Sequence, residues 1–206
     1  MAGLVLAHGA GAGHTSPFMV QTARELAARG ASVATFDFGY MTEGRSAPSK
    51  GPVLEAEWRA AIDAARAHGD LRHLPLFIGG KSMGGRIASQ VAAQQVDGLH
   101  GLIFLGYPLH PPGRPAQRRD AHLPAIKDPM LFVQGTRDEF GTAAEIRELL
   151  PKLSRRTELY DVPDGDHSFR VRVSVAGRKQ DAVLAGIFDA VATFIQTQLR
   201  STPPGA

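Results

Sequence analysis

The sequence of 206 residues contains no cysteine. This absence excludes disulfide bonds, zinc sites built on thiolates and a cysteine nucleophile. No apolar stretch is seen that approaches the roughly 20 residues needed to span a bilayer. The first residues also lack the basic segment and the long apolar segment of a signal peptide. We therefore expect a cytoplasmic protein that does not insert into a membrane.

Excess charge is also small, with a formal net charge of +3 and an isoelectric point near 9.5. The arginines are scattered along the chain rather than gathered into one stripe. We therefore expect no nucleic-acid partner, although an anionic substrate stays open. Hydrophobic residues at 43% and charged residues at 21% are typical of a globular protein. We expect one domain over residues 1–200 and a disordered tail over residues 201–206.

Segments typical of strands and helices alternate along the whole chain. Such alternation predicts a mostly parallel sheet with helices on both faces, which is an α/β three-layer αβα sandwich of about six strands. In such sheets, ligands bind at the carboxyl ends of the strands. The predicted strands cover residues 3–7, 31–36, 74–79, 98–105, 129–134 and 157–162, and the predicted helices cover residues 16–29, 53–68, 83–95, 142–153 and 181–199.

The most informative motif is Gly80-Lys81-Ser82-Met83-Gly84, which lies between a predicted strand and a predicted helix. Strand, G-x-S-x-G and helix form the context of a nucleophile elbow, a turn so tight that its flanking positions need glycine. The motif predicts that the Ser82 hydroxyl stands clear of the sheet at a helix N-terminus. The structural alternative is a glycine-rich turn with a buried serine.

Two nucleotide-binding motifs are imitated but incomplete. A Walker A motif ending at Ser82 would need glycine at position 75, where the chain has Pro75. The glycine-rich turn 9–13, with Asp37 after the next strand, resembles a dinucleotide-binding unit. That fingerprint would need glycine or alanine at position 14, where the chain has His14. Both departures disfavour nucleotide binding.

Partners for a serine nucleophile follow Ser82 in the chain. Asp138 comes directly after the fifth predicted strand, and His167 comes after the sixth. The order Ser, Asp, His is the order of α/β-hydrolases. We predict that Ser82 attacks, that His167 is its base and that Asp138 orients His167. Three other acids lie within six residues of His167 and are rival partners for it, namely Asp161, Asp164 and Asp166.

An oxyanion hole needs two backbone N–H groups. We predict that these belong to Met83, which follows the nucleophile, and to Ala10 in the first glycine-rich turn. His8 is expected to fix that turn. No metal or organic cofactor is needed by this set of residues. Further substrate contacts are predicted at Gly11, Lys81, Tyr107 and Phe140.

With these residues in place, the chain resembles the α/β-hydrolase superfamily over nearly its whole length. More narrowly, it is similar to small bacterial hydrolases related to dienelactone hydrolases. Within these it is most similar to the group that includes the hydrolase-like subunit of the NSL chromatin complex and its testis-expressed relative. The segments that carry the resemblance are 6–13, 79–86, 105–113, 133–138 and 165–169.

The resemblance implies a minimal hydrolase fold that lacks the superfamily's first two strands and any lid domain. Dienelactone hydrolases proper use cysteine where this chain has Ser82, which favours simple esters or thioesters over lactones. We therefore predict a serine hydrolase that cleaves a small carboxylic ester or thioester through an acyl-serine intermediate. The alternative is a catalytically weak scaffold or binding protein of hydrolase shape. The oligomeric state is unknown from the sequence.

Overall fold

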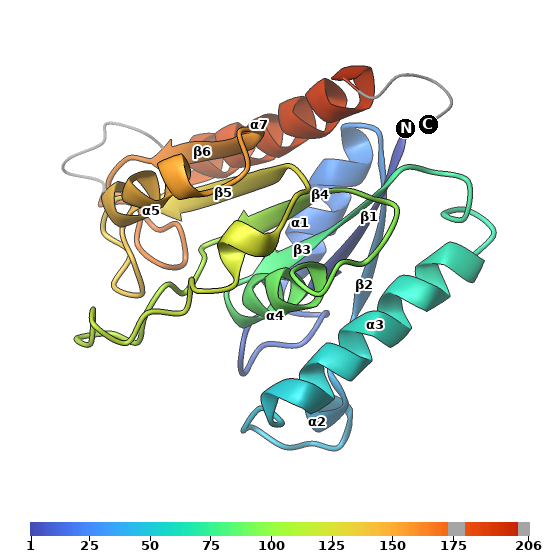
Figure 1. Ribbon diagram of the computed structural model, residues 1–206, viewed down its shortest axis with the longest axis horizontal. Helices are drawn as coiled ribbons and strands as arrows, with labels where there is room; N and C mark the ends of the chain where they lie inside the picture. The colour runs from blue at the N-terminus through green and yellow to red at the C-terminus, as the bar shows by residue number, and fades with distance from the viewer. Residues whose placement is uncertain (173–179, 202–206) are drawn as a thin grey trace.

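The computed structural model describes residues 1–172 and 180–201. Six strands form one sheet in the order β2-β1-β3-β4-β5-β6, and every neighbouring pair is parallel (Figure 1). The prediction of about six parallel strands is confirmed. The strands are β1 (Ala2–Ala7), β2 (Ala31–Phe36), β3 (Leu76–Lys81), β4 (Leu99–Leu105), β5 (Met130–Gly135) and β6 (Thr157–Val162).

Helices cover both faces of this sheet, which confirms the three-layer αβα sandwich (Figure 1). The helices α1 (Pro17–Ala28) and α7 (Gln180–Ser201) contribute to one buried cluster. The other cluster takes its helical side chains from α3 (Gly51–Ala67), α4 (Met83–Ala92) and α5 (Ala143–Leu149). The sheet therefore separates two hydrophobic cores.

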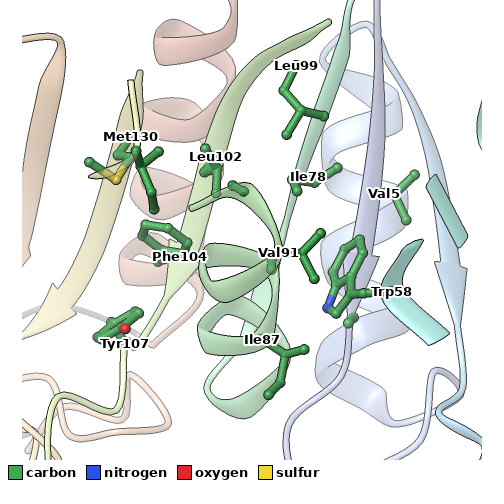
Figure 2. Packing of buried hydrophobic residues seen from close by; sticks show 14 of the residues in the cluster. Val5, Trp58, Ile78, Ile87, Val91, Leu99, Leu102, Phe104, Tyr107 and Met130 are labelled. Carbon is green, nitrogen blue, oxygen red and sulfur yellow. The ribbon is translucent and has the colours of Figure 1, made fainter. Parts of the chain in front are cut away.

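The alternation of side chains along each strand explains this division. On β1, Leu4 and Leu6 belong to the core beneath α1 and α7, whereas Val5 belongs to the opposite core. Because successive side chains of a strand point to opposite faces, a strand covered on both sides has to be apolar throughout. Figure 2 shows the core beneath α3 and α4, where Trp58 and Val91 approach the strand residues.

Local sequence signals explain several element boundaries. A capping box starts α5, because the Thr142 side chain accepts a hydrogen bond from the Glu145 N–H and the Glu145 carboxylate accepts one from the Thr142 N–H. The predicted single helix 142–153 was too long. It changes into a 3₁₀ turn at Leu150–Lys152, where Pro151 has no N–H to continue the α-helical pattern.

The loop between β4 and β5 is rich in polar residues, but its apolar side chains pack into the protein. Its apolar side chains at Tyr107, Leu109, Leu123 and Ile126 are buried, and residues Leu123–Ala125 form a short 3₁₀ turn. The loop between β2 and α3 likewise contains a short helix, α2 (Gly39–Thr42). Both loops are thus fixed to the body of the protein. Within the described residues, no inserted lid lies over the carboxyl ends of the strands.

Helix α7 corrects one expectation about hydrophobic length. Its 22 residues include an 18-residue window of mean hydropathy 1.4, which is long and apolar enough to cross a membrane by length and composition. The core helix of a folded domain passes the same test. Side chains of α7, including Ile187, Val191 and Phe194, are buried against the sheet. With 39% of this window buried, these contacts account for part of the apolar composition of the helix.

Candidate active site

Ser82, Asp138 and His167 lie just beyond the carboxyl ends of β3, β5 and β6. In the sheet, β5 and β6 are neighbours, and β4 lies between β5 and β3. Because all the strands are parallel, their carboxyl ends share one edge of the sheet. The topology therefore brings together three side chains that are separated by up to 85 residues in sequence.

The turn at Ser82 has the geometry of a strained elbow. Ser82 has φ 49° and ψ −116°, a backbone conformation that is rare for a residue with a side chain. A Cβ atom added to Gly80 would lie 2.2 Å from the Ala7 carbonyl oxygen, and one added to Gly84 would lie 2.4 Å from it. The predicted need for glycine on both sides of the serine is confirmed, because β3 and α4 pass too close to β1 for side chains there.

Hydrogen bonds join the three side chains in series. The Ser82 Oγ lies 2.9 Å from His167 Nε2, and His167 Nδ1 lies 2.8 Å from Asp138 Oδ2. The Asp138 side chain is fully buried, whereas 18% of the His167 side chain is exposed. An imidazole in this position can accept a proton from the serine while the carboxylate holds the Nδ1–H.

Asp138 is held in place by its surroundings. Its Oδ2 accepts a hydrogen bond from Gln134 Nε2 at 2.9 Å, and its Oδ1 accepts one from the Phe140 N–H at 2.8 Å. The rival acids have other partners: Asp161 pairs with an arginine, Asp164 pairs with two arginines and Asp166 accepts two N–H groups of its own turn. Asp138 is therefore the carboxylate that contacts His167.

The first glycine-rich turn is fixed from beneath by His8. This side chain is buried, its Nε2 accepts a hydrogen bond from the Phe38 N–H at 3.2 Å, and its Nδ1–H can then donate to the Gly9 carbonyl at 2.7 Å. Burial alone would raise the pKa of Asp37, but hydrogen bonds from His14 lower that pKa below its usual range. The Asp37 carboxylate is hydrogen-bonded to His14 and thus stabilises this turn.

The two predicted oxyanion donors border the same cleft as Ser82. This cleft has a volume of about 840 Å³, and both Ala10 and Met83 line it. Within the described part of the chain, the N–H groups of Ala10 and Met83 donate no hydrogen bond. Met83 is buried and Ala10 is exposed, and an N–H without an acceptor at the edge of a cleft is available to a ligand oxygen.

The four predicted substrate contacts have different outcomes. Lys81 and Phe140 line the cleft, and the Phe140 ring lies 4.3 Å from the His167 ring between centroids. Gly11 is exposed and is not among the lining residues. Tyr107 is fully buried in the core (Figure 2). Its hydroxyl donates to the Arg119 carbonyl at 2.8 Å. Tyr107 therefore supports a wall of the cleft and does not line it.

The Lys81 amine makes its contacts within the protein. Its Nζ donates to the His167 carbonyl at 2.5 Å and lies 5.1 Å from the centre of the Phe169 ring. Burial lowers the pKa of this amine to about 8, although the charges of Asp138 and Asp166 oppose the shift. Lys81 thus ties the elbow of β3 to the loop that carries His167.

Sequence reasoning missed two residues of this site. Gln134 is fully buried, accepts a hydrogen bond from the Tyr107 N–H and donates to Asp138. The signal for Gln134 in the sequence was its position, as a glutamine in an otherwise apolar predicted strand and four residues before Asp138. Arg86, four residues after Ser82, also lines the cleft. Its helical spacing from the nucleophile could have indicated that position.

No group of three or more histidine, aspartate or glutamate side chains that could hold a metal ion occurs among residues 1–172 and 180–201. The histidine closest to a carboxylate at the site, His167, is hydrogen-bonded to Ser82 and Asp138 instead. The arrangement is suited to proton transfer and nucleophilic attack by a serine.

Comparison with known families agrees with this arrangement. The sequence matches the family described as alpha/beta hydrolase domain over residues 1–196. The chain belongs to this family. The match covers every element from β1 to most of α7, so the resemblance noted from the sequence holds at the level of the superfamily.

Solved structures share the fold of this alpha/beta hydrolase. Dienelactone hydrolase from Anabaena variabilis ATCC 29413 matches with a TM-score of 0.74 and 21% identity, covering 96% of this chain and 86% of that one. Est1E from Butyrivibrio proteoclasticus, with ferulic acid bound, matches with a TM-score of 0.74 and 14% identity, covering 97% and 90%. The Pyrococcus furiosus esterase Pf2001 matches with a TM-score of 0.71 and 15% identity, covering 95% and 82%. At these identities the likeness concerns the fold.

Proposed function

We propose that the protein is a serine hydrolase that cleaves a carboxylic ester or thioester through an acyl-serine intermediate. The observation that carries this proposal is the hydrogen-bonded series from Asp138 through His167 to Ser82, with Ser82 on a strained elbow in a cleft. A serine hydroxyl is a poor nucleophile near neutral pH and needs such a base. The substrate is a small molecule, and no metal or organic cofactor enters the scheme.

The first half of the reaction forms the acyl-serine. His167 Nε2 takes the proton of Ser82 as Oγ attacks the carbonyl carbon, and Asp138 stabilises the imidazolium through Nδ1–H. The Ala10 and Met83 N–H groups would hold the oxyanion, and each such donor contributes about 3 kcal/mol to transition-state stabilisation. His167 then gives its proton to the leaving alcohol or thiol. The C–O or C–S bond breaks, and the acyl group remains on Ser82.

The second half repeats these roles with water. His167 takes a proton from a water molecule that attacks the acyl carbon, and the same N–H groups stabilise the second oxyanion. His167 then returns the proton to Ser82 Oγ as the acyl–oxygen bond breaks. The products are a carboxylic acid and the free enzyme, so protons and electrons balance.

The neighbouring structures support an esterase class. Two of them are named as a dienelactone hydrolase and an esterase, and another holds ferulic acid. The narrower kinship with the NSL-complex hydrolase-like subunit rests only on the motifs in the sequence and is part of the proposal. So are the cytoplasmic location, the absence of nucleic-acid and membrane partners, and small or flexible acyl groups, which an open cleft without a lid favours.

The test is intact-protein mass spectrometry after exposure to a fluorophosphonate probe. We expect one adduct on the parent protein, none on Ser82→Ala and much slower labelling of His167→Ala. Ser168→Ala, which changes another, exposed serine that lines the same cleft, is the matched control and should label like the parent. No adduct on a folded parent would contradict the proposal and would favour the alternative of a catalytically weak scaffold.

A panel of p-nitrophenyl esters and the corresponding thioesters then defines the acyl group. We expect turnover of short acyl chains and loss of turnover of at least about 1,000-fold in Ser82→Ala, in line with the removal of a serine nucleophile. A preference for long-chain lipid esters would contradict the inference of small or flexible acyl groups.

A further inference from the structure

The cleft beside Ser82 is lined by charges of one sign. Among the described lining residues there is no aspartate or glutamate. The chain as a whole has 23 lysine and arginine residues against 20 aspartate and glutamate residues, so the composition does not explain this imbalance. The cationic lining residues are Lys81, Arg86, Arg119 and Arg170.

Two of these four cationic side chains do not need a bound ligand to offset their charge. The Lys81 amine already donates to the His167 carbonyl and lies over the Phe169 ring. Arg170 is exposed, so water can solvate its guanidinium. Arg86 and Arg119 remain, and both are half-buried.

Arg86 has no carboxylate partner. Its guanidinium donates a hydrogen bond to the neutral Gln90 Oε1 at 3.2 Å, and within the described residues it forms no ion pair. Burial lowers its pKa below the usual range and the charge of Arg119 adds to that effect, while Tyr107 and the charge of Glu55 oppose it without reversing it. Arg86 also lies in the first turn of α4, where the helix dipole disfavours a cation. Three unfavourable factors thus act on one guanidinium.

Arg119 is held firmly beside this site. Its N–H donates to the Leu109 carbonyl at 2.8 Å, and its carbonyl accepts the Tyr107 hydroxyl at 2.8 Å. Its guanidinium, like that of Arg86, has no ion pair within the part of the chain that the structure describes. The backbone contacts fix where the side chain starts, while its charged end stays available.

Other arginines near the active-site loops show the usual arrangement. Arg118 pairs with Asp120 at 2.8 Å, and Arg137 pairs with Asp164 at 2.8 Å. Arg86 and Arg119 differ from these because they are half-buried in the cleft and, within the described residues, form no ion pair, whereas the unpaired Arg170 is exposed to water. Bringing two like charges together away from water is unfavourable unless an anion offsets it.

We propose that the cleft binds an ester or thioester with a second, anionic group, a carboxylate or a phosphate, held by Arg86 and Arg119. Guanidinium groups suit both anions because they form paired N–H···O hydrogen bonds. Apolar lining residues, including Leu54 and Met83, would contact the chain between the anion and the scissile carbonyl. The inference names the substrate class and rests on the proposed hydrolase function.

The kinetic test compares matched p-nitrophenyl esters, corrected for spontaneous hydrolysis. The anionic probes are 4-nitrophenyl hydrogen adipate and 4-nitrophenyl 6-phosphonooxyhexanoate, and the neutral probe is methyl 4-nitrophenyl adipate. We expect kcat/KM for an anionic probe to exceed that for the neutral probe by about tenfold or more, as one charge-assisted hydrogen bond provides. The probe with the higher kcat/KM decides between carboxylate and phosphate.

Variants locate the effect. We expect Arg86→Gln and Arg119→Gln each to lower the ratio of anionic to neutral kcat/KM by about tenfold, mainly through KM. Arg118→Gln, which changes the neighbouring arginine outside the cleft, should leave the ratio unchanged. Thermal unfolding of each variant separates misfolding from lost binding, and Arg119→Gln serves if Arg86→Gln does not fold. A parent ratio near one, or a ratio that survives both replacements, would overturn the proposal.

A binding test works even without turnover. We would titrate the parent with 6-phenylhexanoate, 6-phenylhexanamide and 6-phenylhexyl phosphate by isothermal calorimetry. Tighter binding of an anion than of the amide, lost in the Arg86→Gln/Arg119→Gln double variant, supports the anion site even if no ester is hydrolysed, in which case the hydrolase function alone fails. Equal binding of all three compounds would mean that Arg86 and Arg119 are only solvated by water. That result would overturn the inference.

Discussion

At the scale of single residues, the side chains around Ser82 have different roles in the site. Ser82 is exposed to the cleft by its strained backbone, while Lys81 points its amine to the His167 carbonyl. Gln134 satisfies the buried Asp138 and also binds the backbone of Tyr107. Loss of one such buried partner leaves an unsatisfied group, which costs about 1–3 kcal/mol. The side chains to which we assign the chemistry are therefore held by neighbouring residues that have only a structural role.

Lys81 gives a pH-dependent prediction. Its pKa is about 8 in the folded protein, lowered mainly by burial, against an ordinary value of 10.5. Between these two values the unfolded chain binds more protons, so the lysine's contribution to stability rises with pH. We expect the unfolding free energy of the parent to rise relative to Lys81→Met between pH 7 and pH 10, by no more than about 3 kcal/mol.

Urea unfolding of both proteins at several pH values measures this difference. Lys152→Met, which removes an exposed lysine, supplies the baseline. A difference between the parent and Lys81→Met that stays constant or falls as the pH rises would contradict the inferred burial of the amine.

At the scale of elements, the elbow depends on how closely α4 and β3 approach β1. The Ser82 N–H donates to the Leu105 carbonyl, which also anchors the turn to β4. A Cβ atom on Gly135 would similarly lie 2.3 Å from the Gly165 carbonyl oxygen, at the point where the chain after β5 meets the loop after β6. These two close approaches, which only glycine permits, set the positions of the loops that carry Ser82, Asp138 and His167.

Gly84→Ala tests the first close approach. The new Cβ would lie 2.4 Å from the Ala7 carbonyl oxygen and 2.6 Å from that of His8, so α4 has to move away from β1. We expect a loss of about 1–3 kcal/mol in unfolding free energy, as for other overpacked sites, together with slower labelling of Ser82. Urea unfolding and the fluorophosphonate rate measure these two effects.

The control for this variant is Gly69→Ala, where an added Cβ would meet nothing within 4 Å. We expect its unfolding free energy to change by no more than about 1 kcal/mol. Equal stability and equal labelling of Gly84→Ala and the parent would show that the contact of α4 with β1 can relax without disturbing the elbow.

At the scale of the whole molecule, one sheet couples two cores. Strand residues such as Leu4 and Val5 belong to opposite cores although they are adjacent in sequence. The single tryptophan, Trp58, is fully buried on α3, and its Nε1–H donates to the Gly84 carbonyl at 3.0 Å. A disturbance of the elbow is therefore transmitted to α3, and loss of either core exposes the shared strands.

Trp58 offers a direct test of this coupling. We expect the urea transition followed by Trp58 fluorescence to coincide with the transition followed by far-ultraviolet circular dichroism, because α3 cannot leave the sheet while the other core stays intact. A fluorescence midpoint well below that of circular dichroism would mean that the core beneath α3 and α4 unfolds separately.

The order of elements, the parallel sheet, the elbow and the three side chains at strand ends could all be predicted from the sequence. These follow from local signals, namely the period of apolar residues, the glycines around Ser82 and the capping box at Thr142. Such signals act over a few residues and can therefore be recognised in the sequence alone.

Which side chains contact one another depends on the folded arrangement of the strands and loops. Asp138 rather than a nearer acid contacts His167 because the carboxyl ends of β5 and β6 lie side by side, whereas the nearer acids are occupied elsewhere. Tyr107 was placed in the core, and Arg86 was left without an acidic partner, by packing between segments far apart in sequence. Contacts of this kind depend on burial and on the distances between strand ends, which no short sequence pattern contains.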